Sequence, residues 1–176
     1  IVLTQTGTLF SKAIYLYTKD PYNHASISFD RNLEIMYSFG RKQRYNPLDS
    51  GFIEENFTRG MFAFFPNTRC CIIEVKVTEN EFWAMQETIN FFKNNQNNYR
   101  YNLIGVLSYT VGVGVTRKEH YFCSQFVSYI LSKTNVWPFI PELTKPIDFL
   151  KIPNNKIIYE GPIAEFTRVG WGRLTS

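Results

Sequence analysis

Two residues, His24 and Cys123, are of the types that form a nucleophile–base pair. Cys123 begins a predicted helix with the sequence CSQFVSYILSK, and His24 begins a predicted strand in the segment NHASISFDRNLEIMYSFG. A cysteine thiolate needs a base that is close in space, although that base can be distant in sequence. The pair therefore points to a cysteine hydrolase or an acyl-transfer enzyme.

The predicted place of Cys123, in the first turn of its helix, bears on its reactivity. Unpaired backbone N–H groups and the positive end of the helix dipole favour a thiolate over a thiol. The N–H group of Cys123 itself could also donate to an oxyanion in a transition state. The structural alternative is that Cys123 is a small buried residue at the start of an amphipathic helix, and that His24 is a hydrogen-bonded strand residue at the edge of the core.

His120 lies three residues before Cys123. The HxxC spacing is compatible with zinc, but a zinc site needs three or four ligands. The remaining candidates, Cys70 and Cys71, are neighbours on a predicted strand and point to opposite faces. We therefore expect no metal and no cofactor. His120 is expected to line a cleft, whereas His24 is the preferred base, because a base so near in sequence must double back to reach the sulfur.

A predicted hairpin carries His24. From residue 24 onward polar and apolar side chains alternate, which predicts a half-polar strand, and the alternation resumes over residues 33–40. If the apolar faces match across the hairpin, a turn at residues 31–33 places Glu34 and Ser38 on the face of His24. A two-residue turn would invert this arrangement.

The remaining elements are predicted from periodicity and from capping residues. Thr78 and Glu81 form a capping-box pattern, and apolar residues then recur at helical spacing up to the Asn run at 94–98. Residues 41–60 contain Gly, Pro, Asp and Asn and predict a long surface loop. The other predictions are strands over 2–6, 61–65, 70–77 and 156–159, helices over 8–18, 121–133 and 145–150, and either a buried helix or a strand over 103–115.

Composition predicts one α+β domain over residues 1–176. A chain of 176 residues that is 44% hydrophobic can bury one good core and is too short for two comfortable domains. The net charge of +4 is mild, and its only dense cluster, Arg41, Lys42 and Arg44, is interpreted as a solvated loop, so no nucleic-acid partner is expected.

The cysteine count and the apolar runs bear on the compartment. Three cysteines, two of them vicinal, do not suggest a disulfide framework, and free cysteines favour a reducing compartment such as the cytoplasm. The longest nearly apolar run, residues 103–115, is shorter than the roughly 20 residues that span a bilayer, so no membrane span is expected.

The order of the motifs resembles a known family. A histidine on a strand, a second strand, and much later a cysteine at a helix start are similar to the circularly permuted branch of the papain-like NlpC superfamily. The matching segments are YNHASISFD at 22–30, LEIMYSFGRK at 33–42 and YFCSQFVSYIL at 121–131. They resemble the YiiX-like members and, more distantly, the lecithin retinol acyltransferase group. Such proteins are amidases, peptidases, thioesterases or acyltransferases that proceed through an acyl-cysteine.

The resemblance also implies a third polar residue on the strand after the His strand, where it orients the imidazole. Ser38 occupies that position here. A hydroxyl orients an imidazole more weakly than a carboxylate does. Glu34 is the alternative, although it lies four positions from Ser38, which is about 13 Å along a strand.

Two other functions remain open from the sequence. One is a noncatalytic ligand-binding domain on the same fold, in which aromatic residues such as Tyr37, Tyr45, Phe52 and Trp83 line a groove. The other is a lipid acyltransferase. The substrate, whether a peptide amide, an isopeptide, a lipid ester or a thioester, is not determined by the sequence, and neither is the oligomeric state.

Overall fold

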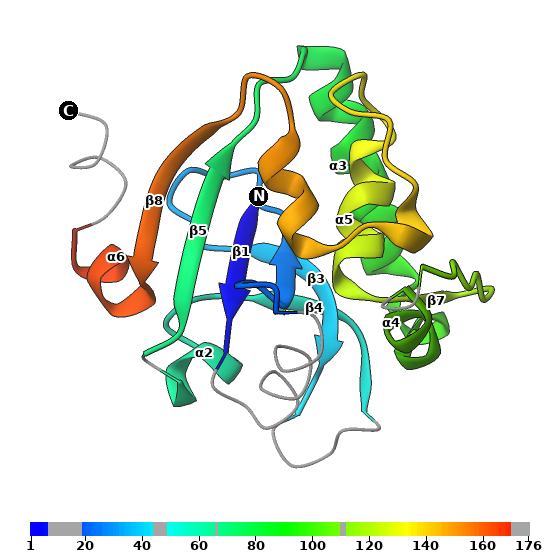
Figure 1. The fold of residues 1–176 in the computed structure, drawn as a ribbon, viewed down its shortest axis with the longest axis horizontal. Coiled ribbons are helices and arrows are strands. Elements are labelled where there is room, and N and C mark those ends of the chain that lie inside the picture. The colour runs from blue at the N-terminus through cyan, green and yellow to red at the C-terminus, as the bar shows by residue number, and fades with distance from the viewer. Residues whose placement is uncertain (7–18, 44–48, 66, 110–111, 170–176) are drawn as a thin grey trace.

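The computed structural model describes residues 1–6, 19–43, 49–65, 67–109 and 112–169 (Figure 1). The helix predicted over 8–18 lies outside the described residues. In chain order the elements are β1 (Val2–Gln5), β2 (His24–Ser26), β3 (Met36–Arg41), β4 (Ser50–Glu55), α2 (Gly60–Phe64), β5 (Arg69–Glu74), α3 (Glu79–Asn94), η1 (Gln96–Asn98), β6 (Arg100–Tyr101), α4 (Leu103–Tyr109), β7 (His120–Tyr121), α5 (Cys123–Leu131), η2 (Pro141–Leu143), η3 (Pro146–Lys151), β8 (Lys156–Pro162) and α6 (Ile163–Val169).

An antiparallel sheet of four strands, in the order β2-β1-β5-β8, forms the centre. Leu3 of β1 pairs with Ala25 of β2 on one side and with Cys71 of β5 on the other. β3 and β4 form a separate antiparallel hairpin. Within the described residues one bridge, between Ile27 and Tyr37, joins this hairpin to the chain just after β2. β6 and β7 form a short parallel pair. The chain is therefore a mixed α+β protein with antiparallel sheets, as predicted.

The larger hydrophobic core lies between the central sheet, the β3–β4 hairpin and the helices α3 and α5, which lie side by side in Figure 1. Alternate strand residues such as Leu3 and Cys71 point into it, together with Phe39 from β3. The ring of Phe39 lies 5.1 Å from that of Phe126 on α5 and 6.0 Å from that of Phe92 on α3. Aromatic packing thus ties the hairpin to the helix that begins at Cys123.

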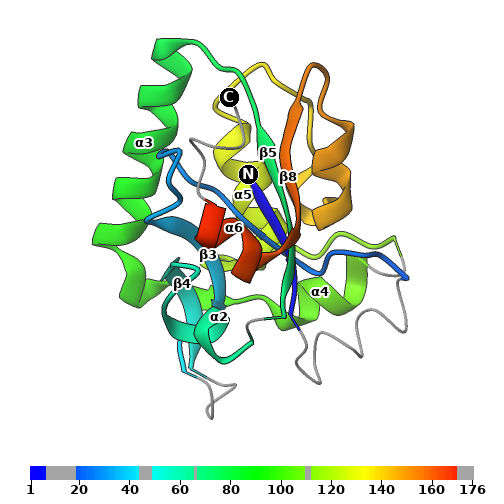
Figure 2. The ribbon, with the colours of Figure 1, turned by 90° about the vertical axis from the view of Figure 1, so that its left-hand side faces the viewer.

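A second core covers the opposite face of the sheet. Val2 and Cys70, which alternate with the residues of the first core, pack there with Phe62 of α2 and Phe166 of α6. Figure 2 shows α6 on the near side of β5 and β8, with α5 behind them. The prediction that Cys70 and Cys71 point to opposite faces is confirmed, and so is the interpretation of Cys71 as a core residue.

The strongly periodic segments were predicted correctly. α3 begins after Thr78 with the expected capping box, in which the Thr78 hydroxyl accepts from the Glu81 amide. α5 begins at Cys123 and β8 begins at Lys156, as predicted. The predicted helix near residues 145–150 is the 3-10 helix η3, and the ambiguous run from residue 103 begins with the helix α4.

The secondary structure of two segments was predicted wrongly. Residues 41–60 are not a continuous loop, because they contain the strand β4. β4 pairs with β3 because this pairing buries Phe52 against Phe39. Residues 61–65 are not a strand, because Gly60–Phe64 form the helix α2. In α2 only Phe62 is buried, and Phe64 is 54% exposed. Short apolar runs do not distinguish a strand from one helical turn.

Candidate active site

Cys123 is the first residue of α5, which follows directly from the short strand β7. Its side chain is buried, and its Sγ atom lies 4.0 Å from the backbone oxygen of Asn23, the residue before β2. The helix α5 packs against β2 and β3. The N–H group of Cys123 lies in the first turn, where no intrahelical acceptor exists. The predicted proximity of Cys123 to the His24 strand is therefore found in the structure.

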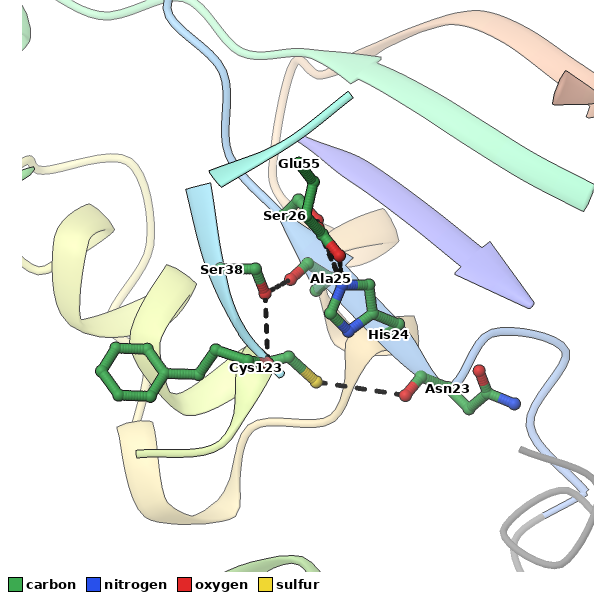
Figure 3. Close-up of polar contacts among 8 residues, drawn as sticks. Asn23, His24, Ala25, Ser26, Ser38, Glu55 and Cys123 are labelled. Atoms are coloured by element: carbon green, nitrogen blue, oxygen red, sulfur yellow. Dashed lines mark hydrogen bonds and ion pairs between the residues drawn. The ribbon is translucent and has the colours of Figure 1, made fainter. Parts of the chain in front are cut away.

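His24 is the first residue of β2, and a carboxylate holds its ring (Figure 3). The Nε2 atom lies 3.0 Å from Oε1 and 2.9 Å from Oε2 of Glu55. The two side chains are only 17% and 11% exposed. An ionised carboxylate only accepts hydrogen bonds, so Nε2 carries a proton. In Figure 3 the imidazole lies between Glu55 and Cys123, with its second nitrogen turned toward Cys123.

Ser26 joins the same cluster from the other end of β2. Its hydroxyl group, which is fully buried, donates to Oε2 of Glu55 over 2.5 Å. Its oxygen also lies 3.3 Å from Nε2 of His24. Because side chains two residues apart on a strand point to the same side, His24 and Ser26 meet the carboxylate together. Glu55 thus binds two donors from β2.

The charge of Glu55 governs the protonation of His24. Burial alone lowers the pKa of His24, because it disfavours the charged ring. The Glu55 carboxylate and the hydrogen bond with Cys123 act in the opposite direction and outweigh burial, so the pKa of His24 is held well above its usual value of 6.5. These two contacts therefore favour the imidazolium form of the ring. A cation of this kind stabilises a neighbouring thiolate.

The other two cysteines lie in a different environment. Cys70 and Cys71 are fully buried in the two cores, and burial raises their pKa values to about 12 and about 11. A second cause at Cys71 is the negative charge of Glu160. All three cysteines are free. Only Cys123 combines a helix N-terminus with an imidazolium partner.

The orienting contact predicted for Ser38 is made instead by Glu55. Ser38 is fully buried, and its hydroxyl donates to the backbone oxygen of Ala25 over 2.7 Å, next to His24 in sequence but not to its ring. Within the described chain, Ile27 alone forms a backbone bridge between this edge of β2 and β3. The Ala25 carbonyl therefore accepts its hydrogen bond from the Ser38 side chain and not from a backbone N–H group of β3.

Glu34, the alternative third residue, is exposed and lies outside β3. The turn is longer than predicted, because the Asp30 carboxylate accepts from the amides of Glu34 and Ile35 before β3 begins. The side chain of Glu34 therefore does not approach His24.

The sequence does not identify Glu55, because residues 41–60 predict a loop. One signal is present: within that predicted loop, the segment SGFIEE places two apolar residues before two acidic ones. In the structure Glu54 forms a 2.7 Å ion pair with Lys93 of α3, whereas its neighbour Glu55 turns to His24. Such alternation is typical of a strand, and it identifies one of the two carboxylates as inward-facing.

His120 is not part of the cluster. Its Nδ1 atom lies 2.7 Å from the backbone oxygen of Lys118, within the turn before β7. No group of three or more His, Cys, Asp or Glu side chains in the described ranges is arranged to hold a metal ion. No helix in that part of the chain is long and apolar enough to cross a bilayer. Arg44 and Tyr45 lie outside the described residues.

Comparison with protein-family models, with curated proteins and with solved structures found no significant match to this chain. The resemblance to the permuted papain-like branch therefore rests on the motifs in the sequence, and the function is argued from the geometry of Cys123, His24 and Glu55.

Proposed function

We propose that the protein is a cysteine hydrolase, an amidase, peptidase or thioesterase that acts through an acyl-cysteine intermediate. Cys123 is the nucleophile, His24 the acid and base, and Glu55 the residue that orients the imidazole. One observation carries the proposal: the His24 ring lies between the Glu55 carboxylate and Cys123 at the N-terminus of α5 (Figure 3). Nucleophile, base and orienting group in this order are typical of triad enzymes.

In the first half of the reaction, the Cys123 thiolate attacks the substrate carbonyl carbon and forms a C–S bond. The carbonyl π electrons move to oxygen, and the N–H group of Cys123 is placed to donate to that oxyanion. The bond to the leaving group then breaks as His24, protonated at the nitrogen facing the sulfur, gives its proton to the departing amine or thiolate. The products are the acyl-cysteine and a neutral imidazole.

In the second half, His24 takes a proton from water as the water oxygen attacks the acyl-cysteine carbonyl. The C–S bond breaks, which releases the carboxylic acid and restores the thiolate–imidazolium pair. Through both halves the Nε2–H group of His24 stays bonded to Glu55, which fixes the tautomer and the ring plane.

The fold proposed for this function is a circularly permuted papain-like one of the YiiX-like kind. In its support, the base on β2 precedes the nucleophile on α5 in the chain, and the nucleophile helix packs against β2 and β3 of antiparallel sheets. The motifs at 22–30, 33–42 and 121–131 contain these elements. A carboxylate in the orienting position fits the triad better than the hydroxyl of Ser38.

Brief alkylation with iodoacetamide at neutral pH tests the nucleophile. Cys123 should be labelled well before Cys70 and Cys71, because burial holds the pKa values of the latter two at about 12 and about 11. His24→Ala should slow the labelling of Cys123, and His120→Ala, the matched control, should not. Equal labelling of all three cysteines, or a larger effect of His120→Ala, would count against the assignment.

Turnover tests the reaction class. Activity-guided screening of thioesters, peptide amides and esters should find a substrate that leaves an acyl adduct on Cys123, detectable by mass spectrometry of the intact protein. Cys123→Ala should abolish both adduct and turnover. Turnover that survives Cys123→Ala would refute a cysteine mechanism.

A further inference from the structure

We propose that Ser26 is a positioning residue that holds the Glu55 carboxylate against His24. This inference deepens the proposed function and rests on it. It assigns a task to a buried hydroxyl that is the fourth polar member of the cluster, after Cys123, His24 and Glu55.

The hydroxyl of Ser26 has one proton to donate, and the structure fixes where it goes. Nε2 of His24 is itself a donor, so the proton of Ser26 is directed to Oε2 of Glu55, where the O···O distance is 2.5 Å. Hydrogen bonds of this length are typical of a hydroxyl and an ionised carboxylate. The lone pairs of Ser26 then face Nε2–H of His24 at 3.3 Å. Ser26 therefore links the carboxylate and the imidazolium.

The other buried serines of the described chain show what a purely structural hydroxyl does here. Ser38 donates to the backbone oxygen of Ala25, Ser124 to that of Thr144 and Ser128 to that of Gln125, over 2.7, 2.6 and 3.0 Å. All three satisfy carbonyl groups of the main chain. Ser26, equally buried, instead binds a carboxylate that contacts the proposed base.

Glu55 needs such an anchor because of where it lies. It is the last residue of β4, on a hairpin that a single bridge joins to β2, and its side chain has several rotatable bonds. The hydroxyl of Ser26 fixes one carboxylate oxygen on β2, the strand that also carries His24. That oxygen, Oε2, lies 2.9 Å from Nε2, and the second oxygen lies 3.0 Å from it. Without the Ser26 hydroxyl, the Glu55 carboxylate is free to turn toward solvent, and its interaction with the His24 ring is weakened.

The test is an NMR titration of the two histidines in the intact protein. Ser26→Ala should lower the measured pKa of His24 toward its usual value, whereas His120 serves as an internal reference. Ser38→Ala, a change of the same size at an equally buried serine, should leave His24 unchanged. Ser26→Thr, which keeps the hydroxyl group, should restore the titration of His24. In a Glu55→Gln background, Ser26→Ala should have little further effect on the pKa of His24, because the carboxylate charge that Ser26 positions has been removed.

Alkylation of Cys123 supplies a second measurement. Ser26→Ala should slow labelling by about tenfold, the value of one hydrogen bond to a charged group, and should not slow it further beside Glu55→Gln. An unchanged or raised pKa of His24 in Ser26→Ala, or an equal shift in Ser38→Ala, would overturn the positioning role. Neither measurement needs a substrate, so a failure of the proposed hydrolase function, seen as turnover that survives Cys123→Ala, is distinguished from a failure of this inference.

Discussion

Replacing Glu55 with Gln removes a charge from beside His24 and leaves the shape of the side chain nearly unchanged. The carboxylate lies 2.9 Å from Nε2, and both side chains are less than one-fifth exposed. Two unit charges about 4 Å apart attract by about 4 kcal/mol at an effective dielectric constant of about 20, and desolvation offsets part of this. A hydrogen bond to a charged group is worth about 1.5–3 kcal/mol net, so Glu55→Gln should lower kcat/KM by about 10- to 100-fold.

The variant also changes the proton on the ring. The amide of Gln can donate a hydrogen bond to Nε2, and this contact favours the tautomer whose proton lies on the nitrogen that faces Cys123. In that tautomer the nitrogen cannot accept a proton from Cys123 or from water. The loss should therefore fall mainly on kcat. The assay is turnover of the substrate identified by screening, accompanied by the alkylation rate of Cys123 as a function of pH.

Two acidic residues provide the controls. Glu54→Gln changes the adjacent residue, which pairs with Lys93 at the surface, and Glu34→Gln changes the exposed residue that the sequence suggested as an alternative. Neither variant should alter kcat/KM more than about fivefold, because charge pairs at the surface contribute about 0–1 kcal/mol. Full activity of Glu55→Gln, or a loss in Glu34→Gln as large as that in Glu55→Gln, would refute the role assigned to Glu55.

Three further predictions concern stability. Because the pKa of His24 is raised above 6.5, the folded protein retains a proton that the unfolded chain releases. The resulting stabilisation is complete below about pH 6.5 and is lost as the pH rises through the raised pKa. The free energy of unfolding in urea should therefore fall more steeply over this range for the wild type than for Glu55→Gln. Thr4→Val should raise the free energy of unfolding by about 1 kcal/mol in the same assay. Among the described residues, the Thr4 hydroxyl is the only buried side-chain polar group without a hydrogen-bond partner. A decrease in the free energy of unfolding would indicate that the hydroxyl has a partner. Gly51→Ala should lower the free energy of unfolding by about 1–3 kcal/mol and slow the alkylation of Cys123. A Cβ atom at this position would lie 2.7 Å from the backbone oxygen of Tyr99 and would displace the strand that carries Glu55. An unchanged melting temperature would contradict this prediction.

The meeting of His24 and Cys123 could be predicted because each residue begins an element with a strong local signal. α5 is buried along almost its whole length and begins where the apolar pattern begins. β2 pairs with β1 in the central sheet, and its alternation of polar and apolar residues is visible over three or four positions. α3 is equally well marked by its capping box at Thr78. Local patterns of this kind depend little on the rest of the fold.

β4 and α2 could not be predicted, because packing at a distance determines them. Gly51 and the polar residues before it indicate a loop, and the strand exists because Phe52 contacts Phe39 and Phe126, far away in sequence. The helix α2 is only five residues long and buries Phe62 against Phe57, which in turn packs against Phe166. In both segments tertiary contacts decide between conformations that the local sequence leaves nearly equal.

The choice between Ser38 and Glu55 shows what a strand pattern can and cannot say about an active site. Alternation predicts the face on which a side chain lies, but not which partner its polar atoms will find. The short side chain of Ser38 reaches main-chain acceptors close to it, chiefly the Ala25 carbonyl. The longer side chain of Glu55 on β4 reaches the His24 ring instead, and its carboxylate also accepts a hydrogen bond from Ser26.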